Sequence, residues 1–208
     1  MELCAPPSIL RRRSEHERTS SSSLRYDELS PERALRSLYA QDALIELVKA
    51  VTGANRVFRL ADPLGAASVN IFKKSWEHAW HFDEAEFTVT LSLQRAEAGG
   101  DFECTEPLRA SEDDLAFDAA AAVINEHSRY SAQPFRDAAL PKVRATHYEP
   151  GTLQIFNGRC SMHRVSPVVG ATTRLSAVFC YNSQPGFVNS PETQELFWGR
   201  ALQPEQQQ

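Results

Sequence analysis

The chain has 208 residues, of which 42% are hydrophobic and 24% are charged, a composition typical of one globular domain that buries its own core. The net charge is −5 and the run at residues 11–13 is the main cluster of cationic side chains, so no nucleic-acid partner is expected. No apolar run approaches the length that spans a membrane, so no membrane partner is expected either. Nothing in the sequence sets the oligomeric state.

The ends of the chain are expected to lie outside the folded domain. Residues 1–25 contain the run "RRRSEHERTSSSS" and lack aromatic or periodic apolar residues, which predicts a disordered N-terminal tail. A single domain is predicted over residues 26–200, followed by a flexible C-terminal tail over 201–208.

Two helices are predicted from helical spacing and capping signals. The first covers residues 30–53, with Ser30 as the N-cap, Pro31 at the first helical position and Gly53 as the stop. The second covers residues 111–129, where Ser111 and Asp114 have the spacing of a capping box.

The rest of the chain has the short, alternating pattern of β-strands. In "EFTVTLSLQ", for example, apolar residues alternate with polar ones, which predicts one buried and one polar face. A helix followed by about eight short strands favours a mainly β fold with flanking helices, a jelly roll or open barrel, over a parallel α/β sheet. The predicted strands cover residues 56–62, 68–74, 86–94, 99–104, 142–149, 151–158, 163–168 and 173–182.

The cysteines do not have the spacing of a zinc knuckle or a redox pair, and they are too few for a disulfide-stapled secreted scaffold. Reduced thiols in a cytoplasmic protein are the expectation, with an organelle transit segment left open by the Arg- and Ser-rich start. The four are Cys4, Cys104, Cys160 and Cys180.

The pair His81-x-Asp83 is the first candidate for chemistry. On an extended chain, residues i and i+2 point to the same face, so both side chains can bind one metal ion. The alternative is a histidine and an aspartate that hydrogen-bond to each other at a strand end. A competing pair, His147-x-Glu149, runs directly into a Pro-Gly turn and is interpreted as ordinary strand surface.

The far end of the chain supplies further candidates. His163 begins one predicted strand, and Arg174 lies inside a strongly apolar one. Alternation places Arg174 on one face with Ser176, and Phe179 on the other. A buried guanidinium keeps its charge and needs a carboxylate or phosphate partner, and an internal salt bridge is the alternative to a bound ligand.

Taken in order, these residues resemble the signature of the Fe(II)- and 2-oxoglutarate-dependent oxygenases. The resemblance covers about residues 70–184 and includes "GG" before a strand and "PGTLQIFNG" ahead of the second histidine. It implies a double-stranded β-helix, the cupin-like jelly roll. It also implies that His81, Asp83 and His163 hold iron, and that Arg174 and Ser176 bind the distal carboxylate of 2-oxoglutarate.

One position departs from the family pattern. Many small-molecule oxygenases have Asn-x-Tyr before the first ligand, whereas this chain has Asn70-Ile71-Phe72. Asn70 remains a candidate donor to 2-oxoglutarate, with an ordinary strand asparagine as the alternative. Phe72 lacks the hydroxyl.

The implied activity follows from the metal ligands. Two imidazoles and one carboxylate suit Fe(II) and leave three positions for 2-oxoglutarate and O2. The resemblance implies a dioxygenase that hydroxylates an unactivated C–H bond of a small molecule and releases succinate and CO2. Related halogenases have a small residue where Asp83 stands, so the carboxylate favours a halide-free oxidation. The alternatives are a catalytically silent module that binds a metal or an acid, and a prolyl-type hydroxylase of protein side chains.

Overall fold

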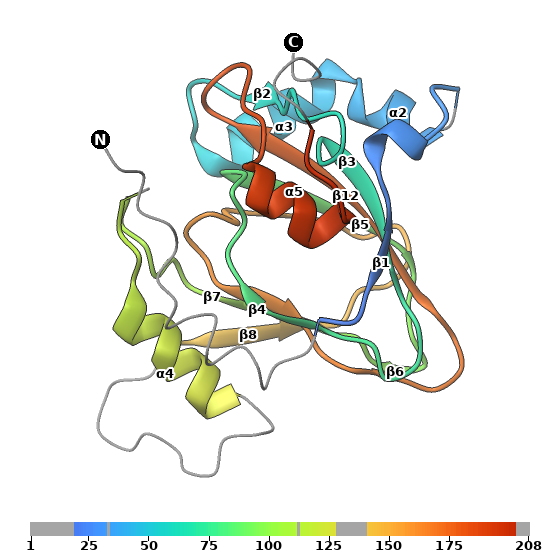
Figure 1. Cartoon of the computed structure of the whole chain (residues 1–208), viewed down its shortest axis with the longest axis vertical. Helices are drawn as coiled ribbons and strands as arrows, with labels where there is room; N and C mark the ends of the chain where they lie inside the picture. The colour runs from blue at the N-terminus through green and yellow to red at the C-terminus, as the bar shows by residue number, and fades with distance from the viewer. Residues whose placement is uncertain (1–18, 33, 112, 128–140, 203–208) are drawn as a thin grey trace.

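The computed structural model describes residues 19–32, 34–111, 113–127 and 141–202, which form two facing β-sheets flanked by helices (Figure 1). The helices are the 3-10 turn η2 (Tyr26–Glu28) and α2 (Ala34–Tyr39), α3 (Asp42–Thr52), α4 (Phe117–His127) and α5 (Pro191–Trp198). The strands are β1 (Ser22–Leu24), β2 (Phe58–Arg59), β3 (Ala67–Phe72), β4 (His78–His81), β5 (Phe87–Gln94), β6 (Ala98–Gly99), β7 (Phe102–Thr105), β8 (Val143–Thr146), β9 (Leu153–Phe156), β10 (His163–Val165), β11 (Val168–Val169) and β12 (Arg174–Asn182).

The two sheets are antiparallel throughout. The larger has the order β1-β3-β12-β5-β9, with β2 also paired to β12, and the smaller has the order β4-β10-β7-β8. The strands β6 and β11 form a separate pair. This is the predicted mainly β architecture with flanking helices.

Side chains along β12 point alternately into the hydrophobic core and into a pocket. Ala177, Phe179 and Tyr181 are fully buried on the outer face of the larger sheet, where they pack under α2 and α3 (Figure 1). Arg174 and Ser176 lie on the inner face and line a pocket between the sheets. The assignment of these faces from the sequence is confirmed.

The predicted helix over residues 30–53 is wrong in extent, because the chain forms two helices there. Gln41 has extended backbone between α2 and α3. Arg59 stabilises the break, since its guanidinium donates to the carbonyl oxygens of Tyr39 and Ala40 and pairs with Asp42. The predicted stop is confirmed: Gly53 closes α3 in the left-handed region with φ of 73°, where glycine has no steric cost.

The second predicted helix starts later than its capping signal. The Asp114 carboxylate accepts hydrogen bonds from the backbone amides of Ala110 and Ala116, so it closes a turn before the helix, and α4 begins at Phe117. Residues 128 and 129, the predicted end of this helix, lie outside the described part of the chain.

The ordered sheet begins before residue 26. Ser22–Leu24 form β1 and pair with Val69–Ile71 of β3, although the sequence places them in the N-terminal tail. Residues 1–18 and 203–208 of the two predicted tails lie outside the described residues. Within the described part of the chain, no helix has the length and apolar character that crossing a membrane requires.

Candidate metal and cosubstrate site

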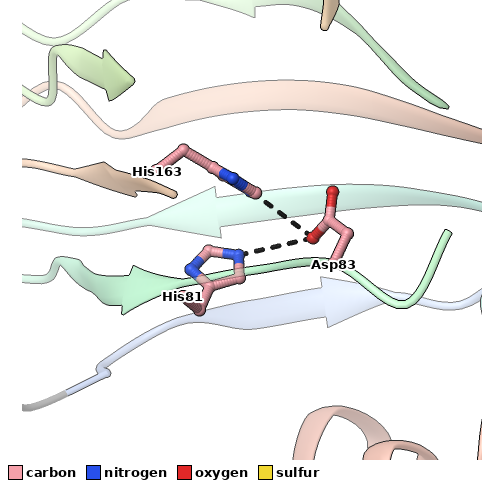
Figure 2. A group of neighbouring side chains, drawn as sticks. All are labelled: His81, Asp83 and His163. Atoms are coloured by element: carbon pink, nitrogen blue, oxygen red, sulfur yellow. Dashed lines mark ion pairs between the residues drawn. The ribbon is translucent and has the colours of Figure 1, made fainter. Parts of the chain in front are cut away.

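Strand pairing between distant segments brings the three predicted metal ligands together. His81 ends β4, Asp83 follows two residues later, and His163 begins β10. These strands are antiparallel neighbours in the smaller sheet, and His163 lies directly opposite His81. The three side chains therefore point toward one another (Figure 2), and all three line the same pocket.

The histidines present their Nε2 atoms to one carboxylate oxygen. Asp83 Oδ1 lies 3.5 Å from Nε2 of His81 and 3.4 Å from Nε2 of His163 (Figure 2). The Nδ1–H of His81 donates to the carbonyl oxygen of Ala79 at 2.8 Å, and that of His163 to Ser161 at 3.0 Å. These bonds fix the tautomer that leaves each Nε2 lone pair free for a metal.

The geometry and charges fit a divalent cation. The ligand atoms of the three residues all lie within 4.8 Å of one another. Burial opposes the charge on Asp83, but the neighbouring His163 and His81 hold the pKa of its carboxyl well below the usual value. Burial lowers the pKa of His81, whereas for His163 the Asp83 charge outweighs burial and raises the pKa. A cation bound at the three ligand atoms would take the place of the proton that His163 otherwise binds. The set of two imidazoles and one carboxylate suits Fe(II).

Two other histidines, one near His81 in the sequence and one in the competing His-x-Glu pair, are not part of the group of metal ligands. His78 is buried and stacks on the ring of His81 at 4.0 Å between centroids, so it supports that ring without entering the ligand set. His147 lies on the surface, with Nδ1 2.6 Å from Asp101 and Nε2 3.1 Å from Arg95. The interpretation of the His147–Glu149 pair as strand surface agrees with this position.

Arg174 is buried, and no described residue pairs with its guanidinium. Its side chain faces the pocket that also holds the three ligands, a cavity of about 130 Å³, and it packs over the ring of Phe72. Burial lowers the pKa of Arg174 to about 10, although Tyr148 and Asp101 act in the opposite direction. An internal salt bridge, the alternative left open by the sequence, is not formed with any residue of the described segments.

Ser176 and Asn70 lie beside Arg174 on the pocket face. They are directly opposite each other in the register of β12 and β3, and Ser176 is buried. Asn70 Oδ1 accepts a hydrogen bond from Ser23 at 2.7 Å, which leaves the amide Nδ2 to donate. Phe72 is fully buried in a small apolar cluster, so the hydroxyl of the family pattern is absent at that position.

Tyr148 is a residue that the sequence argument missed. It lines a small cavity together with Arg174, and its buried hydroxyl has no partner of hydrogen-bonding geometry among the described residues. Burial raises the pKa of Tyr148 to about 12, although Thr146 and Arg174 act in the opposite direction. A neutral donor thus lies near the unpaired guanidinium, and only the pairing of β8 with β7 places it there.

The helix α5 lies between the two sheets in Figure 1, and its last two residues, Phe197 and Trp198, line the pocket that holds the metal ligands. The ring of Phe197 lies 5.6 Å from that of His78 and 6.1 Å from that of His81. Glu84 holds the start of this helix, since its carboxylate accepts from the hydroxyls of Ser190 at 2.5 Å and Thr193 at 2.7 Å. The Ser-Pro pair at the start of α5 is a helix signal that could have revealed this element.

A family model described as "HalD: Halogenase D" matches residues 10–198 of the chain. The search of curated proteins found no match. Among solved structures, AviO1 from Streptomyces viridochromogenes Tue57 is 15% identical, with a TM-score of 0.57 over 82% of this chain and 70% of that one.

Two further solved structures have the same fold. An oxidoreductase of the 2OG-Fe(II) oxygenase family from Burkholderia pseudomallei is 16% identical, with a TM-score of 0.52 over 85% of this chain and 78% of that one. HygX from Streptomyces hygroscopicus, solved with nickel and 2-oxoglutarate bound, is 15% identical, with a TM-score of 0.51 over 86% and 76% of the two chains. The predicted jelly-roll fold, a double-stranded β-helix, is confirmed.

Proposed function

The chain belongs to the Halogenase D family, and we propose that it hydroxylates an unactivated C–H bond of a small molecule, with release of succinate and CO2. The family match and the fold confirm the resemblance found in the sequence, so the protein is an oxidoreductase of the Fe(II)- and 2-oxoglutarate-dependent oxygenases. Its cofactors are Fe(II), 2-oxoglutarate and O2.

The carboxylate of Asp83 is the observation that carries the choice of hydroxylation. Halogenases that resemble this pattern have a small residue at this position, and the space it leaves takes a halide. Here Asp83 Oδ1 lies within 3.5 Å of both histidine Nε2 atoms, in the place of the third ligand. With three protein ligands, the remaining positions suffice for the cosubstrate and O2, and none is left for a halide.

His81, Asp83 and His163 would hold the iron. With iron and 2-oxoglutarate bound, O2 would be the oxidant: one oxygen atom would enter the C–H bond and the other succinate, and 2-oxoglutarate would supply two of the four electrons. The backbone carbonyls of Ala79 and Ser161 orient the two imidazoles, so the ligand atoms need little rearrangement on binding.

Four side chains would receive 2-oxoglutarate. Arg174 offers its unpaired guanidinium to the distal carboxylate in a two-pronged hydrogen bond, and Ser176 and Asn70 add neutral donors from the same face. Tyr148 would add a hydroxyl from the small cavity that it lines together with Arg174. Holding the distal end fixes the direction in which the keto acid reaches the metal.

A small substrate suits the space that remains. The pocket lining includes the aromatic rings of Phe82, Phe197 and Trp198, which would shield the reacting carbon from water. Incubating the iron-loaded protein with metabolite extracts, 2-oxoglutarate and air tests the proposal by mass spectrometry. We expect succinate and a product heavier by one oxygen atom, both dependent on iron. A product in which chlorine replaces hydrogen, or the absence of any succinate, contradicts it, and modification of a peptide instead points to a prolyl-type hydroxylase.

Metal binding should raise the thermal stability of the wild-type chain. Because a ligand that binds only the folded state at about 100 times its Kd stabilises by about 2.7 kcal/mol, Co(II) or Mn(II) added to the metal-free protein should raise Tm by several degrees. His163→Ala should lose this shift, and His147→Ala, which removes the surface histidine, should keep it. Differential scanning calorimetry measures the Tm shift of the wild type and of each variant. An equal shift in all three proteins contradicts the ligand assignment.

Tyr148→Phe should weaken 2-oxoglutarate binding without loss of stability. A hydrogen bond to a charged group contributes about 1.5–3 kcal/mol, so removing the hydroxyl should raise the Kd of metal-loaded protein about tenfold or more. Tyr181→Phe is the matched control, because its hydroxyl is also buried without a partner among the described residues but lies in the core. Calorimetric titration that finds equal Kd values in both variants removes Tyr148 from the site.

A further inference from the structure

We infer that Thr88 and Gly158 form a seat for the Asp83 carboxylate, which fixes the oxygen that faces the two histidines. Thr88 is a positioning residue in this seat, because it acts on the metal through Asp83. The inference rests on the proposed metal site. It adds Thr88, which lies outside the motifs of the resemblance, and gives a role to Gly158, the last residue of the "PGTLQIFNG" segment.

Thr88 holds one oxygen of the carboxylate away from the histidines. It lies on β5 with 2% of its surface exposed, and its Oγ1 donates to Asp83 Oδ2 at 2.6 Å. The other oxygen, Oδ1, is the atom near Nε2 of His81 and His163. A short hydrogen bond to a charged acceptor is among the stronger ones, so Oδ2 is kept on the hydroxyl and Oδ1 is left for the metal.

Gly158 supplies the space that the carboxylate occupies. A Cβ built on this glycine would overlap Asp83 Oδ2 and lie 2.8 Å from Cγ and 2.9 Å from Cβ of Asp83. Its carbonyl oxygen also accepts a hydrogen bond from the Asp83 backbone amide at 2.9 Å. This glycine is therefore required by the close approach of Asp83, and a side chain here would displace the carboxylate.

The seat has a consequence for coordination. A carboxylate that uses both oxygens occupies two metal positions, and one that uses a single oxygen occupies one. With Oδ2 held by Thr88, Asp83 takes one position, and three positions remain for the cosubstrate and O2. Thr88 and Gly158 fit an aspartate at position 83. If a small residue stood at that position, there would be no carboxylate for them to hold.

The test compares metal affinities of metal-free variants, by titration with Co(II) and by the visible absorption of the bound ion. Thr88→Val keeps the β-branched shape and removes the hydroxyl, so its Kd for Co(II) should rise about 10- to 100-fold, the usual effect of losing an outer partner of a ligand. Thr88→Ser keeps the hydroxyl and should restore most of the affinity. Thr90→Val is the matched control, because Thr90 lies two residues along the same face of β5 and makes no hydrogen bond to Asp83 in the described structure.

Each outcome decides a separate question. If Thr88→Val binds Co(II) like wild type, or loses no more affinity than Thr90→Val, the seat is wrong while the metal site stands. If wild type itself binds no Co(II) and produces no succinate, the proposed function fails. If Thr88→Val does not fold, Gly158→Ala provides the test. Its added methyl group should displace Asp83 and so weaken Co(II) binding. Unchanged affinity for Co(II) in that variant overturns the inference.

Discussion

Asp83→Ala is expected to leave a folded protein that no longer hydroxylates its substrate. The substitution removes one of three protein ligands, and since losing an outer partner of a ligand already costs about 10- to 100-fold, metal affinity should fall by at least about 100-fold. The free energy of unfolding should fall by about 1–3 kcal/mol, because the buried Thr88 hydroxyl loses its acceptor, and the protein should still fold. Succinate formation, product mass and Tm measure these effects together.

Glu149→Ala is the matched control for that experiment. Glu149 belongs to the competing His-x-Glu pair, and its carboxylate pairs with Arg95 at the surface, so activity should survive. Normal turnover by metal-loaded Asp83→Ala contradicts the ligand assignment. Chloride supplied to wild type provides a second check, because a chlorinated product from the chain that retains Asp83 contradicts the proposed reaction.

Patterns that depend on one strand were predictable from the sequence. The alternation of β12 needs no knowledge of its neighbours, and it placed Arg174 and Ser176 on the pocket face and Phe179 in the core. The same holds for β5, where Thr88 lines the pocket and Val89 is fully buried in the core.

Features that depend on contacts between distant segments were not predictable. The break between α2 and α3 is stabilised by Arg59, which lies on β2, so helical spacing alone merges the two helices. Three residues are too few to show a strand pattern, and β1 exists because the edge of β3 accepts it.

The candidate site likewise contains some residues that could be predicted from the sequence and others that could not. The metal ligands were identifiable because their residue types and order resemble a known signature. Thr88 and Tyr148 lie outside the motifs of the resemblance, and Gly158 ends one of them with no role that the sequence assigns. All three acquire a role only when β5, the turn before β10 and the end of β8 are placed against Asp83 and Arg174.

Arg174→Ala is expected to lose most of the affinity for 2-oxoglutarate. Truncating one partner of a buried charge pair costs about 2–5 kcal/mol, which corresponds to a Kd raised about thirtyfold to a few thousandfold. Arg174→Lys keeps the charge but loses the planar two-pronged hydrogen bonding, so its Kd should lie between those of wild type and the alanine variant. Titrating 2-oxoglutarate into each protein, loaded with an inert divalent metal, gives the three values.

Stability separates a ligand clamp from a structural salt bridge. In the absence of 2-oxoglutarate, no described residue compensates the buried charge of Arg174, so Arg174→Ala should leave Tm unchanged or raise it. Arg164 is the matched control, because its guanidinium pairs with Glu103 at 2.7 Å inside the smaller sheet. Arg164→Ala should therefore lower Tm and leave the Kd for 2-oxoglutarate unchanged. If Arg174→Ala behaves like Arg164→Ala in both measurements, Arg174 stabilises the fold and another group must hold the cosubstrate.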